Sequence, residues 1–126
     1  MNRHVLLVED EPNIVEAIRF LLTREGWKVD CHSDGNDAVE AVQNLKPNLL
    51  ILDLMLPGRS GLDILRDLRA LSEFENLPVL MLTARGQSRD RDMAERAGVS
   101  RFMTKPFSNV EVLTAVRDLV ALAGRA

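Results

Sequence analysis

Five side chains that can bind a cation or a phosphoryl group each stand at or just after the end of a short apolar run in the sequence. They are Glu9, Asp10, Asp53, Thr83 and Lys105. Carboxylates with no histidine or cysteine nearby favour Mg2+ over zinc, and Mg2+ pairs readily with phosphate oxygens. A lysine supplies a second positive charge, and a threonine hydroxyl can donate a hydrogen bond to a phosphoryl oxygen. Together these groups predict a phosphoryl-transfer site in which a carboxylate is the nucleophile.

The combination of these residues carries the prediction, because a single charged residue at the end of a strand is usually just exposed to solvent. Neighbouring carboxylates repel one another by about 1–4 kcal/mol per pair at contact distance. A fold that gathers Glu9, Asp10 and Asp53 therefore needs a cation to offset that repulsion. Asp53 is the first candidate for the nucleophile, since it ends the most apolar run of the chain, Leu49–Leu52.

The apolar runs have the length of strands and alternate with amphipathic segments of helical spacing. The expected strands are Val5–Val8, Trp27–Cys31, Leu49–Leu52, Val79–Leu82 and Phe102–Thr104. The expected helices run from Pro12 to Gly26, from about Asn36 to Leu45, around Leu65–Leu71, from Gln87 to Ala97, and onward from a capping box of Ser108 and Glu111. A strand–helix order repeated in this way predicts a parallel sheet with helices on both faces.

The order of the strands follows from how apolar each one is. A strand buried on both faces should be continuously apolar, which places the first, third and fourth strands in the centre. The alternating second strand and the short fifth strand then lie at the edges. This predicts a doubly wound, five-stranded α/β fold of order 2-1-3-4-5, the flavodoxin-like (βα)5 arrangement. In such sheets ligands bind beyond the carboxyl ends of the strands, at the switch point between strands one and three.

Composition places the chain among ordinary globular domains. Its 126 residues are 46% hydrophobic and 28% charged, with a net charge of −3. We therefore expect one domain over residues 1–126 and no surface for direct DNA binding. Cys31 is the one cysteine, which excludes an internal disulfide. The apolar stretch before Glu9 is too short for a signal peptide and no apolar run approaches ~20 residues, so we expect no membrane contact and a cytoplasmic location.

Several short motifs occur in order along nearly the whole chain. They are Val5–Asp10 followed by Glu11-Pro12, the segment Leu50–Gly58, Gly61, Thr83-Ala84, and Thr104–Phe107. Each motif alone has low specificity, but together they resemble the receiver domain of bacterial two-component response regulators. The resemblance implies a single-domain, chemotaxis-regulator-like protein that acts as a phosphorylation-dependent signalling switch.

The resemblance also implies a role for each residue of the site. Asp53 would be the phosphoacceptor, which attacks a phosphohistidine of a sensor histidine kinase or of a histidine phosphotransfer protein. Asp10, Asp53 and the backbone carbonyl of Met55 would bind Mg2+, while Glu9 would act through a water or from the surrounding layer. Lys105 would pair with the phosphoryl group or with Asp53.

A second set of implied roles concerns how phosphorylation is read out. Thr83 would move to bond a phosphoryl oxygen, Ala84 would leave access to it, and Lys105–Pro106 would be a cis peptide. Phe102 occupies the position of the family's aromatic switch, with a plain core phenylalanine as the alternative. The signal would reach a downstream protein through the face formed by the fourth helix, fifth strand and fifth helix. The few apolar residues of the fourth helix agree with this, since weakly packed elements are free to move.

Further expectations concern assembly and output. Relatives that dimerise through their last helices usually carry acidic residues after the glycine that precedes strand five, whereas Gly98 is followed by Val99-Ser100-Arg101. We therefore expect a monomer before phosphorylation. We also expect no output domain on this chain and no enzyme activity beyond its own phosphorylation and dephosphorylation. Met55 and Arg85 flank the pocket, and we hypothesise that Arg85 screens the phosphoryl group from water.

Other classes of protein fit parts of the pattern less well. An aspartate-nucleophile phosphatase needs a second aspartate two positions after Asp53, where this chain has Met55. A flavin or nucleotide carrier of the same topology needs a phosphate-binding loop after the first strand, and the charge of Glu9–Pro12 is wrong for one. The length of the chain and the lack of a linker after Ala123 disfavour a receiver cut from a longer DNA-binding regulator. A phosphorylation-independent binding module stays open until phosphorylation is measured.

Overall fold

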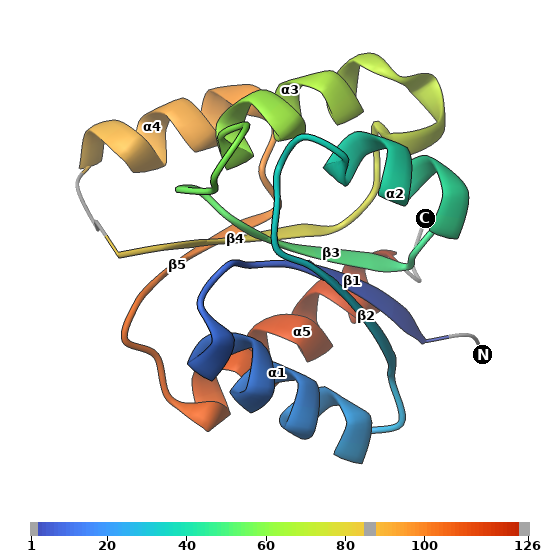
Figure 1. The fold of residues 1–126 in the computed structure, drawn as a ribbon, viewed down its shortest axis with the longest axis vertical. Helices are drawn as coiled ribbons and strands as arrows, with labels where there is room; N and C mark the ends of the chain where they lie inside the picture. Colours follow the sequence, from blue (N-terminus) through green and yellow to red (C-terminus); the bar gives the residue numbers. More distant parts are fainter. Residues whose placement is uncertain (1–2, 85–87, 124–126) are drawn as a thin grey trace.

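The computed structural model describes residues 3–84 and 88–123 of the chain. Within these ranges five parallel strands form one sheet in the order β2-β1-β3-β4-β5 (Figure 1). Their bounds are His4–Val8 for β1, Lys28–His32 for β2, Leu49–Asp53 for β3, Val79–Thr83 for β4 and Arg101–Thr104 for β5. The predicted strand order and the predicted parallel direction are both confirmed.

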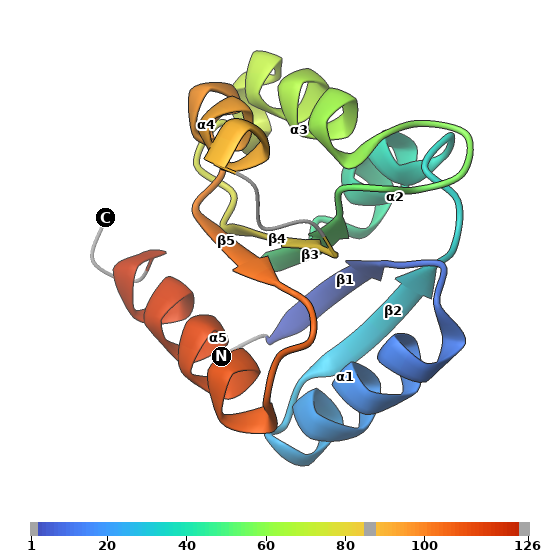
Figure 2. The same ribbon diagram turned by 90° about the vertical axis from the view of Figure 1, so that its left-hand side faces the viewer.

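Helices cover both faces of the sheet. They are α1 (Pro12–Arg24), α2 (Ala38–Leu45), α3 (Gly61–Ala70), α4 (Ser88–Ala97) and α5 (Asn109–Ala123), with a short 3-10 helix η1 at Ser72–Phe74. Helices α2, α3 and α4 lie on one face, and α1 and α5 lie on the other, as Figures 1 and 2 show. Among the described residues, no helix combines the length and the apolar composition that crossing a membrane would need.

The two faces of the sheet bury separate apolar cores, because successive side chains of a strand point in opposite directions. Leu6 and Leu50 belong to the core under α2, α3 and α4, whereas Leu7 and Ile51 belong to the core over α1 and α5. β3 and β4 are buried along their whole length and β1 from Val5 onward, while β2 and β5 are only partly buried at the edges. Truncating a core residue such as Ile51 to alanine would cost about 2–5 kcal/mol. The central strands are therefore rigid supports for whatever stands at their ends.

Local signals in the sequence fix several helix ends as predicted. Pro12 occupies the first turn of α1, and Gly26 follows that helix with a φ of 90°. The capping box before α5 is complete: the Glu111 N–H donates to Ser108 Oγ at 3.1 Å, and the Ser108 N–H donates to Glu111 Oε1 at 3.2 Å. Two otherwise unpaired backbone donors are thus satisfied at the helix start.

The boundaries of β2 and α2 differ from the prediction. β2 is shifted by one residue and shows no alternation in burial, because an edge strand is covered only in part on each face. α2 begins at Ala38 rather than Asn36, since the Asn36 N–H donates instead to Asp34 Oδ1 at 2.7 Å in the preceding turn. α2 ends at Leu45, and the capping residue Lys46 that follows has a left-handed φ of 47°.

The buried stripe of α5 is also displaced from the one predicted. Val116 is buried as expected, but Leu113 and Val120 are only partly buried. The fully packed positions are Val112, Ala115, Val116 and Leu119. These positions recur at i, i+3, i+4 and i+7, as on one face of a helix. The face of α5 that packs on the sheet is therefore rotated slightly about the helix axis from the predicted face.

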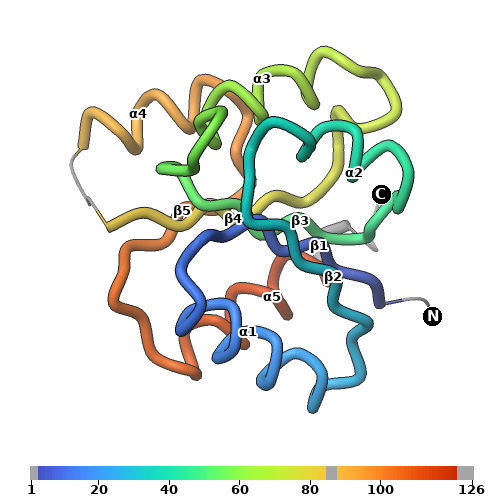
Figure 3. The backbone as a smooth tube through the Cα atoms, in the orientation of Figure 1, coloured from blue at the N-terminus to red at the C-terminus, as the bar shows by residue number. Residues whose placement is uncertain are grey.

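The carboxyl ends of the parallel strands meet at one edge of the sheet. In the backbone trace of Figure 3, the segments that follow β1, β3 and β5 all lie at the left of the view. The strand register aligns Val8 with Leu52, and Thr83 with Thr104. Residues that follow these positions in different parts of the chain are therefore neighbours in space.

Candidate functional site

The ends of β1 and β3 bring three carboxylates together. Glu9 and Asp10 follow β1, and Asp53 is the last residue of β3. One carboxylate oxygen of each residue lies within 4.8 Å of the others. Glu9 and Asp53 are only 1% and 3% exposed, whereas Asp10 is exposed. The convergence predicted from the sequence is present, and it places two acidic groups below the surface, where their charge needs compensation.

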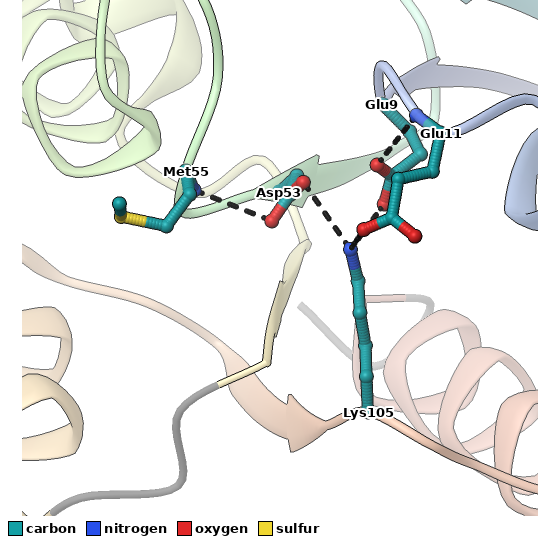
Figure 4. A network of polar contacts seen from close by, with 5 residues as sticks. All are labelled: Glu9, Glu11, Asp53, Met55 and Lys105. Atoms are coloured by element: carbon teal, nitrogen blue, oxygen red, sulfur yellow. Dashed lines mark hydrogen bonds and ion pairs between the residues drawn. The ribbon is translucent and has the colours of Figure 1, made fainter.

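Lys105 supplies positive charge to this cluster from just beyond β5. Its Nζ lies 2.9 Å from Glu9 Oε1, 3.0 Å from Glu11 Oε1 and 3.3 Å from Asp53 Oδ2 (Figure 4). Burial alone would lower the pKa of Lys105, but its close contacts with the Glu9 and Glu11 carboxylates and the charges of Asp53 and Glu9 outweigh burial. The pKa of Lys105 therefore lies above its ordinary value, and the ammonium stays charged.

Glu9 is the carboxyl group whose protonation the site alters. Burial raises the pKa of Glu9 to about 7; Lys105 acts in the opposite direction, and the nearby Asp53 adds to the rise. Glu9 Oε2 accepts a hydrogen bond from the Glu11 N–H at 3.1 Å. Glu9 Oε1 is buried and accepts no hydrogen bond of good geometry from any residue that the structure describes, although it forms an ion pair with Lys105. The site thus holds a buried carboxylate oxygen with unused lone pairs.

This set of oxygen donors fits a hard cation. Glu9, Asp10 and Asp53 offer carboxylate oxygens, and the cluster contains no histidine or cysteine. Oxygen ligands select Mg2+ or Ca2+ over zinc, and a site with few protein ligands suits Mg2+, which keeps several waters. The unused Glu9 Oε1 agrees with this, because a cation or its bound water would satisfy it.

The segment after β3 fixes the orientation of Asp53. The Met55 N–H donates to Asp53 Oδ1 at 3.3 Å, so the two Asp53 oxygens face Met55 and Lys105 respectively (Figure 4). The Met55 side chain itself points outward and is 58% exposed. A Cβ on Gly61 would lie 2.2 Å from the Asp53 carbonyl oxygen, so only glycine fits at the start of α3.

Thr83 and the Lys105–Pro106 peptide complete the neighbourhood of the carboxylates. Thr83 ends β4 and is fully buried, and its carbonyl accepts the Lys105 N–H at 2.7 Å. The peptide between Lys105 and Pro106 is cis, as the resemblance implied. Ala84 follows Thr83 and is exposed. Arg85, which we expected to screen the pocket, lies outside the described residues.

Phe102 lies on β5, apart from the carboxylates. It is half-buried and packs against the core under α2, α3 and α4 rather than inside it. The Arg91 guanidinium on α4 lies 5.5 Å from the centre of the Phe102 ring, within range of a cation–π interaction. Helix α4 fully buries Ala94 alone among its residues. The ring is therefore neither a plain core residue nor a free surface residue.

Two of these contacts were not predicted from the sequence. Glu11 joins Lys105 although its side chain is 56% exposed, and a third acidic residue directly after Glu9 and Asp10 was the signal that could have indicated it. The Arg91–Phe102 contact has no comparable signal, since it depends on how α4 is rotated about its axis against β5.

The sequence matches a known family over most of its length. Residues 5–117 match the family described as response regulator receiver domain. The chain is 42% identical over 120 residues to "Probable transcriptional regulatory protein TcrX" of Mycobacterium tuberculosis (strain ATCC 25618 / H37Rv). The matched region covers 95% of this chain and 50% of that protein. The chain thus spans about half the length of this curated relative.

Solved receiver structures share the fold. The BeF3-activated N-terminal receiver domain of Klebsiella pneumoniae RstA is 27% identical with a TM-score of 0.86, over 94% of this chain and 98% of that chain. The receiver domain of the sensor histidine kinase PA1611 from Pseudomonas aeruginosa PAO1, which has a magnesium ion coordinated in its active site cleft, is also 27% identical. Its TM-score is 0.87, over 96% of this chain and 99% of that chain.

Proposed function

The chain belongs to the response regulator receiver family of two-component systems, and on this premise we propose that Asp53 accepts a phosphoryl group from a phosphohistidine. The donor is a sensor histidine kinase or a histidine phosphotransfer protein. An Asp53 carboxylate oxygen forms a bond to phosphorus while the phosphorus–nitrogen bond of the donor breaks, and the imidazole keeps the electron pair. The observation that carries the proposal is the buried Asp53 carboxylate, whose Oδ2 lies 3.3 Å from Lys105 Nζ.

The surrounding groups offset the negative charge that gathers at Asp53. Lys105 carries a fixed positive charge next to the acceptor oxygen. Glu9, Asp10, Asp53 and the carbonyl of Met55 would hold Mg2+, with Glu9 acting through a water or as an outer partner. When bound, Mg2+ would neutralise charge on the phosphoryl oxygens and so favour transfer. Support comes from the unused Glu9 Oε1 and from the magnesium ion in the PA1611 receiver.

The readout of phosphorylation is assigned to Thr83 and Phe102. Phosphorylation adds about −1.5 to −2 charge, and the Thr83 hydroxyl would donate to one of the new oxygens. Phe102 would then turn inward, driven by burial because the ring has no hydroxyl. The half-buried position of Phe102 and the sparse packing of α4 support this role. The altered α4-β5-α5 face would bind a downstream protein.

The wider biological setting is also part of the proposal. Residues 1–126 form one receiver domain in the cytoplasm that is monomeric before phosphorylation and does not itself bind DNA. It catalyses only its own phosphorylation and dephosphorylation. TcrX is named a transcriptional regulatory protein and is twice as long as the matched region, which favours a second candidate in which such a domain controls an attached output domain. The chemistry at Asp53 is the same in both cases.

Phosphorylation from a small-molecule donor tests this proposal without a known kinase. The protein is incubated with Mg2+ and acetyl phosphate or phosphoramidate, and its intact mass is measured. We expect the wild type to gain one phosphoryl group and Asp53→Asn to gain none. Asp118→Asn, a matched change at an exposed position of α5, should behave as the wild type. No gain in the wild type with either donor would leave only the phosphorylation-independent binding module.

A further inference from the structure

The segment between β3 and α3, residues 54–60, carries Met55 and has no regular secondary structure. At its end the chain is fixed near Asp53, because the Gly61 N–H donates to the Leu54 carbonyl at 2.9 Å. At its start the Leu54 N–H donates to the Leu82 carbonyl of β4 at 2.8 Å. The middle of the segment needs a different support, since neither bond reaches Pro57–Arg59.

The Arg59 side chain pairs with Asp67 of α3, and the backbone of the segment is supported by the turn between β2 and α2. The Gly35 N–H donates to the Pro57 carbonyl at 3.0 Å. The backbones approach so closely that a Cβ on Gly35 would lie 2.1 Å from the Arg59 carbonyl oxygen. Because real Cβ contacts are essentially never this short, any other residue at position 35 would force the turn and the segment 54–60 apart.

A second glycine makes the contact reciprocal. Gly58 has a φ of 82°, and a Cβ there would lie 2.4 Å from Asn36 Nδ2 and 2.6 Å from Asp34 Oδ1. The Asp34 side chain is held in place, because the Asn36 backbone N–H donates to Asp34 Oδ1 at 2.7 Å and closes a local turn. Each segment therefore places a glycine against the other, and the turn 34–36 forms a close-packed support, here called the seat, for the segment 54–60.

The segment that the turn 34–36 supports also contacts the acceptor carboxylate of Asp53. The Met55 N–H donates to Asp53 Oδ1 at 3.3 Å, so a shift of the segment 54–60 would alter the hydrogen bond that orients the Asp53 carboxylate. The carbonyl expected to serve as a metal ligand belongs to the same residue, Met55. We infer that the turn 34–36, which touches neither carboxylate nor phosphate, positions Met55 and thereby sets the affinity of the site for Mg2+. This inference rests on the proposed function of the site.

Outer groups that orient a metal ligand typically change metal affinity by about 10–100-fold when they are altered. We therefore expect Gly35→Ala to weaken Mg2+ binding at least about tenfold. Asn36→Ala removes the side chain that meets Gly58 without adding a clash, and it should weaken binding about threefold, a smaller effect of the same origin. Isothermal titration with Mg2+ alone measures both, and urea unfolding in EDTA measures the stability of each variant.

Gly26→Ala is the matched control. Gly26 also has a positive φ, of 90°, but a Cβ there would meet nothing within 4 Å. The substitution strains the backbone and lowers stability at a distance from the site, so its Mg2+ affinity should stay within about twofold of the wild type, well short of an effect on a ligand. A general loss of stability would lower Mg2+ affinity in Gly26→Ala as well, whereas positioning of Met55 would not.

The outcomes separate this inference from the function it rests on. If the wild type binds Mg2+ and both Gly35→Ala and Asn36→Ala bind it equally tightly, the seat has no positioning role and the inference is overturned alone. If the wild type itself binds no Mg2+, the metal site fails and the inference fails with it. Should Gly35→Ala not fold, the affinity of Asn36→Ala against Gly26→Ala decides the matter.

Discussion

At the residue scale, the site is organised around one ammonium group. Lys105 Nζ contacts Glu9, Glu11 and Asp53 at 2.9, 3.0 and 3.3 Å, and its side chain is mostly buried. Two of those three carboxylates are buried as well. A buried charge that loses its partner is costly, because neither water nor another ion is there to replace it. Lys105 should therefore stabilise the fold of the metal-free protein as well as serve the chemistry.

Replacing Lys105 with methionine keeps much of the apolar stem and removes the charge. We expect the metal-free variant to lose about 3 kcal/mol of unfolding free energy, the lower end for breaking a buried pair. The loss should shrink at saturating Mg2+, because a second cation can compensate the same carboxylates. Lys46→Met is the control, since Lys46 pairs with Glu73 at the surface and should contribute less than about 1 kcal/mol. Equal losses in urea unfolding for both variants would contradict this account.

Glu9 makes stability depend on pH with a defined sign. Burial raises the pKa of Glu9 from 4.5 to about 7, so the folded protein holds this proton more tightly than the unfolded chain does. The stabilising contribution is complete below pH 4.5 and is lost as pH rises through about 7. In EDTA, the unfolding free energy of the wild type should therefore fall over this window relative to that of Glu9→Gln. A constant difference between the two proteins from pH 4.5 to 8 would refute the assignment.

At the element scale, the central strands and α4 represent opposite extremes of packing. β3 and β4 are buried throughout, whereas α4 fully buries only Ala94. The exposed Arg91 of α4 lies over the ring of Phe102 on β5. An element with few buried contacts opens at low free energy. α4 is thus the helix that the core holds least, which agrees with the proposed readout of phosphorylation through the α4-β5-α5 face.

Amide hydrogen exchange measures this contrast directly. In the unphosphorylated protein, amides in the second half of α4, near Ala94–Ala97, should exchange faster than those in the middle of α3, near Ile64–Leu68. Both segments are hydrogen-bonded helix, so the difference would reflect packing, with Leu65 and Leu68 fully buried in α3. Equal or slower exchange in α4 would show that this helix is not the weakly held element.

The sequence predicted those features that depend on short-range patterns. Apolar runs indicate strands, and a parallel sheet brings the residues at their ends together, so the convergence of Glu9, Asp53 and Lys105 followed from topology. The rotation of α5, the left-handed Lys46 and the cation–π contact of Arg91 did not follow. Each depends on how one element settles against another, which a period of hydrophobicity specifies only to within a residue or two.

At the scale of the whole molecule, the surface near β5 bears on assembly. Arg101, at the start of β5, pairs within the chain with Asp118 of α5 at 2.9 Å. The three residues directly after Gly98, Val99-Ser100-Arg101, carry no acidic group that could meet an arginine of a second copy. Both features disfavour a dimer built on the α4-β5-α5 face.

We therefore expect the unphosphorylated protein to be a monomer in dilute solution. Light scattering coupled to size exclusion should give the mass of a single chain across a tenfold range of concentration. Arg101→Ala is a useful companion variant, because it removes the internal pair with Asp118 and should leave the mass unchanged. A mass of two chains for the wild type would contradict the prediction.

The central claim is that Asp53 itself carries the phosphoryl group. The most direct test is to phosphorylate the protein with acetyl phosphate and Mg2+, reduce the acyl phosphate with borohydride, and map the modified residue by peptide mass spectrometry. The account predicts modification at Asp53 and an unmodified Asp10, although Asp10 is the more exposed of the two. Modification at Asp10, or spread over several acidic residues, would contradict it.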